Sequence, residues 1–419
     1  MSGRRRVVVT GIGAITPVGS GVSGLWDGLC RGISAVRPVS RFDPSPFRSH
    51  LAAEIDGFDP EEFVDARRAR KLERFSQLAV AASIQAVSDA EFQLGTCNES
   101  IGVHVGSALG GVAFGEEQHA HYVERGTRAI SPLTALAVFG GAGAANVAMD
   151  LGLHGPAVGN AGSCASGAIA IGEGFRMLRD DPHAGLHAML AGGAEAPLAP
   201  LTFGAFAIIK AMSTANEVPE RASRPFDRER DGFVMGEGSA MLLLEEREHA
   251  LARGAPVYAE VLGYAQTNDA YHMTAPRPDA IQAARAIRMA LTDAGVEARH
   301  VDYVNAHGSS TPLNDSTEVR ATRAALGERA EQVPVTGTKG LHGHALGASG
   351  AIEMAITCLA IQRGWAPGTT NLREPDPECD LQHLPGVGRP HEIGIALCNS
   401  FGFGGINASL VLAHPDWVD

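Results

Sequence analysis

Cysteines, aromatic residues and long apolar runs are all scarce in this chain of 419 residues. The six cysteines are scattered and form no CxxC pair, which argues against a disulfide framework or a zinc ribbon and favours a reducing compartment. No apolar run has the length of a membrane span, and no apolar core of the signal-peptide type follows the first arginines. We therefore expect a cytoplasmic protein that makes no use of a membrane.

Positive charge is also in short supply. The chain has 34 Lys and Arg against 47 Asp and Glu, a formal net charge of -13, so nucleic acid is not an expected partner. The glycine-rich segment 6–19 lacks the GxGxxG spacing and the acidic residue that follows it in dinucleotide-binding folds. We therefore reject a Rossmann nucleotide site at this place.

What the chain does contain is typical of an α/β protein. Hydrophobic residues make up 45% of it, and its 51 glycines suit many short loops between strands and helices. The chain is too long for one simple core, and its alternation of strands and helices starts again near residue 256. We predict two similar α/β halves, 1–255 and 256–419, that share one layered core.

Four segments carry specific structural expectations. Residues 6–19 predict a buried strand, a glycine turn and a following helix, and residues 67–89 predict one amphipathic helix that opens with basic residues. Residues 131–151 are apolar and rich in Gly and Ala, which indicates a buried helical stretch, with a subunit interface as one place for it. Residues 212–237 form a long loop, which predicts a cover over a functional site.

A single cysteine lies among small residues in the stretch Gly159–Ala170, directly before an apolar helical run. A cysteine in the first turn of a helix sits at the positive end of the helix dipole, which favours its thiolate. The unpaired backbone N–H groups of that turn can receive an oxyanion. Cys164 is therefore a candidate nucleophile, although a small buried core residue would fit this stretch equally well.

Glycine-rich loops follow three predicted strands of the second half, at strand ends of the kind where ligand sites gather in α/β sheets. These loops are the segments 305–318, 336–347 and 399–407. Two of them carry His307 and His344, which together with Cys164 suggest covalent acyl transfer. A metal site is not expected, because His342 and His344 lack the clustered spacing of metal ligands. The order of Cys164, His307 and His344 along the chain does not by itself require a triad in which a carboxylate orients the histidine that pairs with the cysteine.

The Cys164 segment, HGSSTP at 307–312, GTKGLHGH at 337–344 and NSFGFGG at 399–405 together resemble the β-ketoacyl-acyl carrier protein synthases. The resemblance covers nearly the whole chain, and four such motifs in this order are a specific signal. It is closest to the synthase II type of fatty acid synthesis and close to the ketosynthase subunits of dissociated polyketide systems. It implies a thiolase-like α/β fold in which two similar βαβαβαββ halves form a layered α-β-α-β-α core.

The resemblance implies a decarboxylative Claisen condensation without a metal or organic cofactor. Cys164 would take an acyl chain from the phosphopantetheine arm of an acyl carrier protein, with the N–H groups of Cys164 and Phe401 as oxyanion hole and the Phe401 ring as gate. His307 and His344 would then stabilise the enolate of the decarboxylating malonyl carrier protein. The other implied roles are charged or polar support by Lys339, Asp315, Glu318, Glu353 and Asn399, pantetheine binding by Ser309 and Thr311, an acyl pocket at Leu109, Leu133 and Phe206, and carrier docking at Arg68, Arg70, Lys71, Arg128 and Lys210.

Departures from the family pattern leave the acyl chain and the pathway open. Ser163 precedes the cysteine where the family more often has alanine, and Ile406 stands where threonine is usual. The family pairs two such folds, which implies a homodimer or a heterodimer with a homologous chain-length subunit. A non-catalytic chain-length subunit is disfavoured because Cys164 is present. A thiolase acting on acyl-coenzyme A, with Cys398 near its second cysteine, is disfavoured by the paired histidines.

Overall fold

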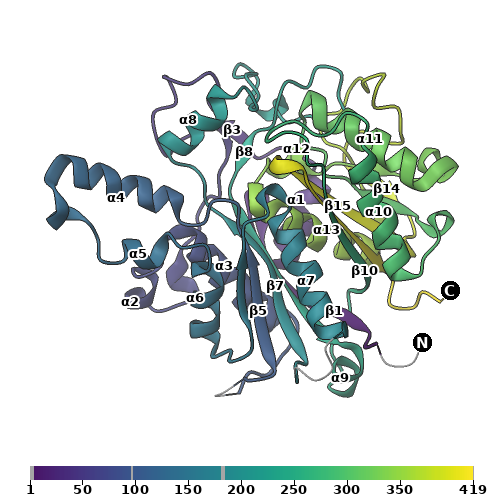
Figure 1. Cartoon of the computed structure of the whole chain (residues 1–419), viewed down its shortest axis with the longest axis horizontal. Helices are drawn as coiled ribbons and strands as arrows, with labels where there is room; N and C mark the ends of the chain where they lie inside the picture. Colours follow the sequence, from purple (N-terminus) through teal and green to yellow (C-terminus); the bar gives the residue numbers. More distant parts are fainter. Residues whose placement is uncertain (1–3, 96–97, 181–184, 419) are drawn as a thin grey trace.

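The computed structural model describes residues 4–95, 98–180 and 185–418 (Figure 1). One eleven-stranded sheet runs through the molecule in the order β12-β11-β15-β16-β10-β1-β9-β7-β5-β6, with β2 paired to β1. In the first half its elements and their helices are β1 (Val7–Thr16), β2 (Gly19–Ser20), α3 (Arg74–Asp89), β5 (Ile101–Gly106), α6 (Ala142–Leu151), β6 (Ala157–Asn160), α7 (Ser166–Asp180), β7 (Ala188–Glu195) and β9 (Gly238–Glu246). In the second half they are β10 (Ala259–Asn268), α10 (Ile281–Ala294), β11 (Tyr303–Asn305), α11 (Pro312–Leu326), β12 (Val335–Thr336), α13 (Ser349–Arg363), β15 (Ile395–Gly402) and β16 (Ile406–Ala413).

The two halves have the same strand order and the same strand directions. In the first half β5 is parallel to β6 and β7, and the order continues antiparallel through β9 to β1. In the second half β11 is parallel to β12 and β15, and the order continues antiparallel through β16 to β10. The two first strands, β1 and β10, pair through 7–9 and 259–261 and join the halves into one sheet.

Two helices form the middle layer between the halves of this strongly twisted sheet. Helix α7 packs on β5 and β7, α13 packs on β9 and β15, and the two helices contact each other. Residues 349–361 of α13 are all buried, as expected of a helix that is apolar all round. A Cβ at Gly167 of α7 would lie 2.8 Å from the Ala351 nitrogen, so only glycine permits this close approach. With α3 and α6 outside one half and α10 and α11 outside the other, the layers are α-β-α-β-α.

The strand β1 corrects the expected glycine turn in residues 6–19. The strand continues through Gly11 and Gly13 to Thr16, with an irregularity in its pairing between Val9 and Gly11. Added Cβ atoms at the two glycines would lie 2.1 and 1.8 Å from backbone oxygens of α3. These glycines therefore bring a helix close to the strand and do not turn the chain.

Two expected helices are each divided in the structure. Residues 67–89 form α2 (Ala66–Ala69) and α3, because the Glu73 carboxylate accepts hydrogen bonds from the N–H groups of Phe75 and Ser76 and begins a new helix. Residues 131–151 form α5 (Thr134–Ala137) and α6, with Gly140 and Gly141 between them. Glycine disfavours continuation of a helix, and here two occur in succession.

The remaining elements lie around this core. They are α1 (Gly21–Arg31), β3 (Val36–Pro38), β4 (Leu51–Ala53), α4 (Val112–Arg125), α8 (Pro200–Ile208), β8 (Met235–Gly236), α9 (Arg247–Ala252), α12 (Lys339–His342), β13 (Trp365–Pro367) and β14 (Gly388–Pro390). Helix α4 projects from the body as an arm (Figure 1). Over the described ranges, no helix is both long and apolar enough to cross a bilayer. Cys97 lies outside those ranges.

Candidate functional site

Cys164 lies in a short turn between the end of β6 and the start of α7. The turn is a 3-10 helix over Ser163–Ala165, and Cys164 is buried within it. Burial raises the pKa of the Cys164 thiol, and three features oppose this rise: the Ser163 hydroxyl, the charge of Lys339 and the backbone N–H of Phe403. The sulfur therefore faces hydrogen-bond donors and a cation at the start of a long helix, as a nucleophile requires.

The two predicted histidines come together although they follow different strands. The ring centroids of His307, after β11, and His344, after α12, are 5.2 Å apart, with the rings at 76° to each other. Both line one cavity of about 320 Å³ with Cys164 and Phe401. The structure thus gathers one thiol and two imidazoles in a shared and open pocket.

Hydrogen bonds to the inner nitrogens orient both imidazoles. The Lys339 ammonium lies 3.4 Å from Nδ1 of His307, and because an ammonium only donates, Nδ1 accepts and the proton sits on Nε2. Nδ1 of His344 lies 2.8 Å from the Ser349 hydroxyl, which can donate to it in the same way. Burial lowers the pKa of both histidines well below 6.5, and the Lys339 charge lowers it further. Each ring is therefore a neutral N–H donor.

Buried charges hold the His307 loop in place. Lys339 donates to the His307 carbonyl at 2.5 Å and forms a buried ion pair with Glu353. Glu318 accepts hydrogen bonds from the N–H groups of His307 and Gly308, at 2.7 and 2.8 Å. Burial raises the pKa of Glu318 to about 7 and that of Glu353 to about 8, and the Lys339 charge opposes both rises. Lys339, Glu318 and Glu353, which were predicted to support the site, therefore form the contacts that hold the His307 loop.

Asn399 is placed differently from this group. Its side chain on β15 accepts a hydrogen bond from the Ser409 hydroxyl of β16 at 2.9 Å. This contact links two strands of the sheet. Asn399 therefore supports the strand that leads to the site, and no contact recorded for the described residues joins its side chain to either imidazole.

The predicted pantetheine-binding residues lie in the wall of the cavity. Ser309 and Thr311 line it, and their hydroxyls are 2.9 Å apart. Asp315 also contributes here, because its carboxylate accepts from the Phe226 N–H at 2.8 Å and lies 3.5 Å from the Ser309 hydroxyl. Phe226 belongs to the long loop 212–237, so this loop is fastened to the wall of the pocket as expected of a cover.

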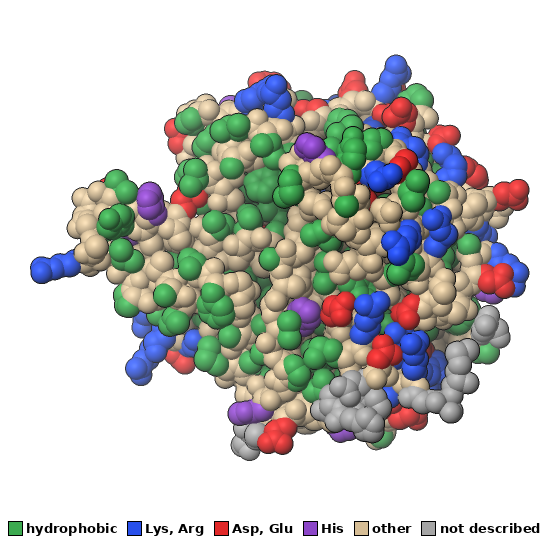
Figure 2. All heavy atoms as spheres, viewed as in Figure 1, with side chains coloured by type: hydrophobic (Ala, Val, Ile, Leu, Met, Phe, Trp, Pro, Cys, Tyr) green, Lys and Arg blue, Asp and Glu red, His purple; other side chains and the backbone are tan. Residues whose placement is uncertain are grey.

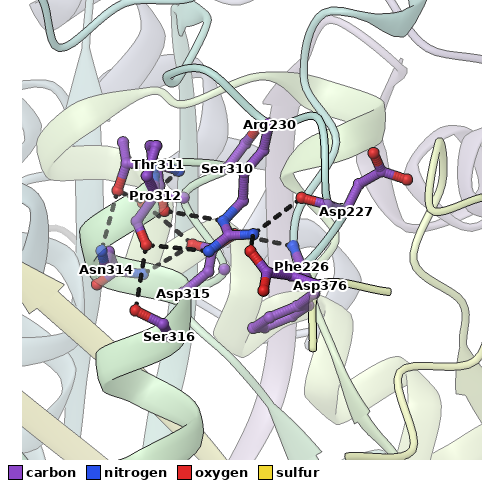
Figure 3. Close-up of polar contacts among 12 residues, drawn as sticks. Phe226, Asp227, Arg230, Ser310, Thr311, Pro312, Asn314, Asp315, Ser316 and Asp376 are labelled. Atoms are coloured by element: carbon purple, nitrogen blue, oxygen red, sulfur yellow. Dashed lines mark hydrogen bonds and ion pairs between the residues drawn. The ribbon is translucent and has the colours of Figure 1, made fainter. Parts of the chain in front are cut away.

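Arg230 fastens that loop more strongly (Figure 3). Its buried guanidinium donates to the carbonyls of Thr311 at 3.2 Å and Pro312 at 3.0 Å. It also pairs with the carboxylates of Asp376 at 2.6 Å and Asp315 at 3.6 Å. One side chain therefore connects the cover loop to the turn that carries the hydroxyls predicted to bind pantetheine.

We expect Arg230→Met to destabilise the chain by about 3–5 kcal/mol, because it leaves two carboxylates without their buried partner. It should also raise KM for pantetheine-bearing substrates by releasing the Thr311 turn. Urea unfolding and steady-state kinetics measure the two effects. Arg228→Met is the matched control: the Arg228 side chain is exposed and forms a 3.9 Å ion pair with the equally exposed Glu374, so the change should alter stability by less than about 0.5 kcal/mol. Equal effects of the two variants would contradict this role.

The acyl-pocket predictions divide into two groups. Phe206 lines the cavity, and Leu109 packs in the same apolar cluster as Cys164. The Leu109 N–H donates to Glu195, which also accepts from Gly347 and so ties this loop to the turn beyond His344. Leu133, directly before α5, is not among the residues that line this cavity.

A second backbone N–H lies near the one predicted for Phe401. Phe401 still belongs to β15, where it pairs opposite Asn407 of β16, and the N–H directed at the Cys164 sulfur is that of Phe403. The Phe401 ring lines the cavity, with its centroid 6.3 Å from that of His307. The Phe403 ring stacks on Phe206 at 6.2 Å. Both rings face the pocket, and the Phe403 N–H is a second candidate for the oxyanion donor, while the Phe401 N–H stays a prediction.

The predicted docking residues are not one uniform set. Lys210, with φ 60°, is exposed at the cavity, and Arg70, Lys71 and Arg128 are also exposed. Arg68 is different, because its guanidinium holds both carboxylate oxygens of Asp150, at 2.6 and 3.0 Å. Arg68 therefore joins α2 to α6, and its role in docking stays a prediction.

Several functional candidates escaped the analysis of the sequence. Phe403 could have been found from the glycines that end the last strand, and Ser349 from its place at the start of the helix after His344. Glu195 and Arg230 carry no comparable signal, because a single carboxylate at a strand end and one arginine in an Arg- and Asp-rich loop are common features.

A thiol beside two neutral imidazole donors, in a layered fold with two alike halves, defines an acyl-transferring condensing enzyme of the thiolase-like class. Residues 4–250 match the family description "Beta-ketoacyl synthase, N-terminal domain" and residues 258–373 match "Beta-ketoacyl synthase, C-terminal domain". The chain belongs to the β-ketoacyl synthase family.

Relatives of this family are similar over the full length. The chain is 45% identical over 408 residues to 3-oxoacyl-[acyl-carrier-protein] synthase 2 of Synechocystis sp., covering 97% of each chain. Among solved structures, a type II polyketide ketosynthase in complex with its acyl-carrier protein is 35% identical, with a TM-score of 0.90 and coverage of 98% and 100%. The ishigamide ketosynthase/chain length factor is also 35% identical, with a TM-score of 0.91 and coverage of 98% and 99%.

Proposed function

We propose that this protein elongates an acyl chain by decarboxylative condensation with malonyl-acyl carrier protein. The observation that carries the proposal is the shared pocket of Cys164, His307 and His344. The relatives named as 3-oxoacyl-acyl-carrier-protein synthases support the same reaction. The product is a β-ketoacyl carrier protein that is two carbons longer than the acyl group received.

In the first half-reaction the Cys164 thiolate attacks the thioester of an acyl carrier protein. The carbonyl oxygen becomes an oxyanion, which the N–H groups of Cys164 and Phe403 receive. The pantetheine thiolate leaves and takes up a proton, and the acyl group stays on the sulfur. Ser309 and Thr311 supply hydroxyls for the amide groups of the pantetheine arm along the cavity wall.

In the second half-reaction the malonyl thioester loses carbon dioxide, and negative charge develops on its carbonyl oxygen. The Nε2–H groups of His307 and His344 donate to that oxygen, and each such donor is worth roughly 3–4 kcal/mol. The resulting carbanion attacks the acyl-Cys164 carbonyl and releases the thiolate. No step of this proposal requires a metal or an organic cofactor.

An acyl carrier protein and a second ketosynthase fold are the proposed partners. Exposed cations near the cavity, including Lys210, suit an acidic carrier. Exposed apolar residues gather on α4–α6, including Val123, Leu136 and Phe139, and Figure 2 shows apolar side chains over this arm, with charged ones at its tip. Sedimentation analysis distinguishes a homodimer from a heterodimer: a dimer of the chain alone indicates a homodimer, and one formed only with a homologous subunit indicates a heterodimer.

The free buried cysteines suit a cytoplasmic enzyme.

Docking is expected to depend on Lys71 and much less on Arg68. Lys71→Glu should weaken carrier binding about three- to tenfold, most strongly at low salt, because it reverses an exposed charge. Arg68→Ala should mainly lower stability, by about 0.5–1 kcal/mol, through the loss of its pair with Asp150. Binding measured at two salt concentrations and urea unfolding check both. A larger loss of carrier affinity in Arg68→Ala would restore Arg68 to the docking surface.

The proposed reaction is tested by intact-protein mass spectrometry after incubation with a panel of acyl carrier proteins. We expect one acyl group on Cys164, and its transfer to a longer β-ketoacyl carrier protein when malonyl carrier protein is added. The masses also identify the preferred chain and hence the pathway. Acylation from acyl-coenzyme A alone, with no carrier-dependent product, would contradict the proposal and favour a thiolase.

A further inference from the structure

The Ser163 hydroxyl lies against the sulfur of Cys164. Its Oγ is 3.9 Å from Sγ, within hydrogen-bonding distance for sulfur. A thiolate can only accept, so toward the thiolate the hydroxyl is the donor. Ser163 is half-buried and does not line the substrate cavity, so its hydroxyl can donate to the sulfur without occupying the cavity.

The backbone places this hydroxyl by means of a strained residue. Ser163 has φ 53°, in the left-handed region that L-residues other than glycine rarely adopt. Such a conformation persists only where neighbouring contacts impose it. Ser166 supplies one of them, because its hydroxyl donates to the Ser163 carbonyl at 2.6 Å.

A half-buried amide and a buried imidazole clamp the same turn. The Asn160 side-chain oxygen accepts from the Gly162 N–H at 3.2 Å, and its nitrogen donates to the Ser166 carbonyl at 3.1 Å. That nitrogen also lies 3.1 Å from Nε2 of His104, a buried residue of β5. The turn is therefore fixed at both ends around Ser163.

The opposite wall leaves little freedom for the Ser163 side chain. An added Cβ at Gly402 would lie 3.3 Å from the Ser163 Cβ and 3.1 Å from the Cys164 nitrogen. The segment 402–403, which brings the Phe403 N–H to the sulfur, thus closes over Ser163 from the other side. Two donors, one from each wall, converge on the same sulfur.

We propose that Ser163 is a further catalytic residue, whose hydroxyl donates a hydrogen bond to the Cys164 thiolate and so favours the nucleophilic form of the sulfur. This inference rests on Cys164 being the nucleophile of the proposed function. It does not depend on which acyl chain is carried. The clamp of Asn160 and His104 positions the donor and does not itself touch the sulfur.

The pH dependence of Cys164 alkylation by iodoacetamide tests this role in Ser163→Ala and Ser163→Gly. Both variants lack the hydroxyl, and glycine also relieves the backbone strain. We expect both to raise the midpoint of alkylation by about 0.5–1 pH unit and to slow alkylation about three- to tenfold below the midpoint. Peptide mass spectrometry assigns the alkylation to Cys164, and thermal unfolding confirms that the variants are folded.

An unchanged midpoint in both variants would overturn the proposal. A shift in Ser163→Ala alone would also overturn it, because backbone strain and not the hydroxyl would then be the cause. If Ser163→Ala does not fold, the glycine variant, which suits the observed φ, carries the test. Alkylation needs no carrier protein, so it decides the role of Ser163 even if no acyl donor is accepted and the proposed function fails.

Discussion

Replacing Cys164 by alanine is expected to abolish acyl transfer and condensation while malonyl decarboxylation continues. The acyl chain has no other sulfur to occupy in the described pocket, because Cys164 is the cysteine that lines it. Condensation should fall by more than about a thousandfold, as expected when a covalent nucleophile is removed. Decarboxylation depends on His307 and His344, which the substitution leaves in place. Carbon dioxide release and product formation, measured side by side, separate the two reactions.

Two cysteine variants make this result specific. Cys30→Ala removes an exposed cysteine on α1 and should leave both reactions unchanged. Cys398→Ala tests the thiolase alternative, although Cys398 is fully buried and its pKa is raised well above 9 by burial. Condensation that survives in Cys164→Ala but is lost in Cys398→Ala would reverse the assignment of the nucleophile.

The layered fold could be predicted because its main signals are repeated along the chain. Buried strands alternate with helices in both halves, and residues 349–362 are apolar on every face, as a middle helix requires. The course of β1 could not be predicted in the same way. Taken alone, Gly11 and Gly13 look like turn residues. The structure explains them differently, because the backbone of α3 lies so close to the strand that no side chain fits at either position.

The candidate site, too, could be predicted only in part from the sequence. Cys164, His307 and His344 stand in glycine-rich turns after buried strands, so their convergence could be inferred from the chain. The choice between Phe401 and Phe403 depends on the residue at which β15 ends, and strand ends are poorly marked in a sequence. The resemblance to the family assigns Arg68 to docking, and its pair with Asp150 could not be foreseen because the two residues lie 82 positions apart.

Replacing His344 by alanine is expected to stop decarboxylation while acylation of Cys164 continues. The ring supplies one of two donors to the developing enolate oxygen, and the loss of one such donor costs about 10²–10³ in rate. His344→Gln, which keeps an N–H near the same place, should lose less. Carbon dioxide release from malonyl carrier protein and mass measurement of acyl-Cys164 check the two steps separately. Loss of acylation with intact decarboxylation would reverse the roles of the residues.

The protonation state of the histidines adds a pH test to this prediction. Because burial and Lys339 lower the pKa of His307 and His344 well below 6.5, both rings stay neutral as the pH falls from 8 to 6. The decarboxylation rate of the Cys164→Ala variant, in which the titrating thiol is absent, should therefore show no step from imidazole protonation. A change between pH 8 and 7 would follow Glu353 and Glu318, whose pKa values burial raises to about 8 and about 7. A rate that rises as the pH falls through 6.5, below both of these values, would show that an imidazolium is the effective donor. Neutral donors are what a buried site beside an ammonium can maintain, since a second positive charge next to Lys339 would be repelled.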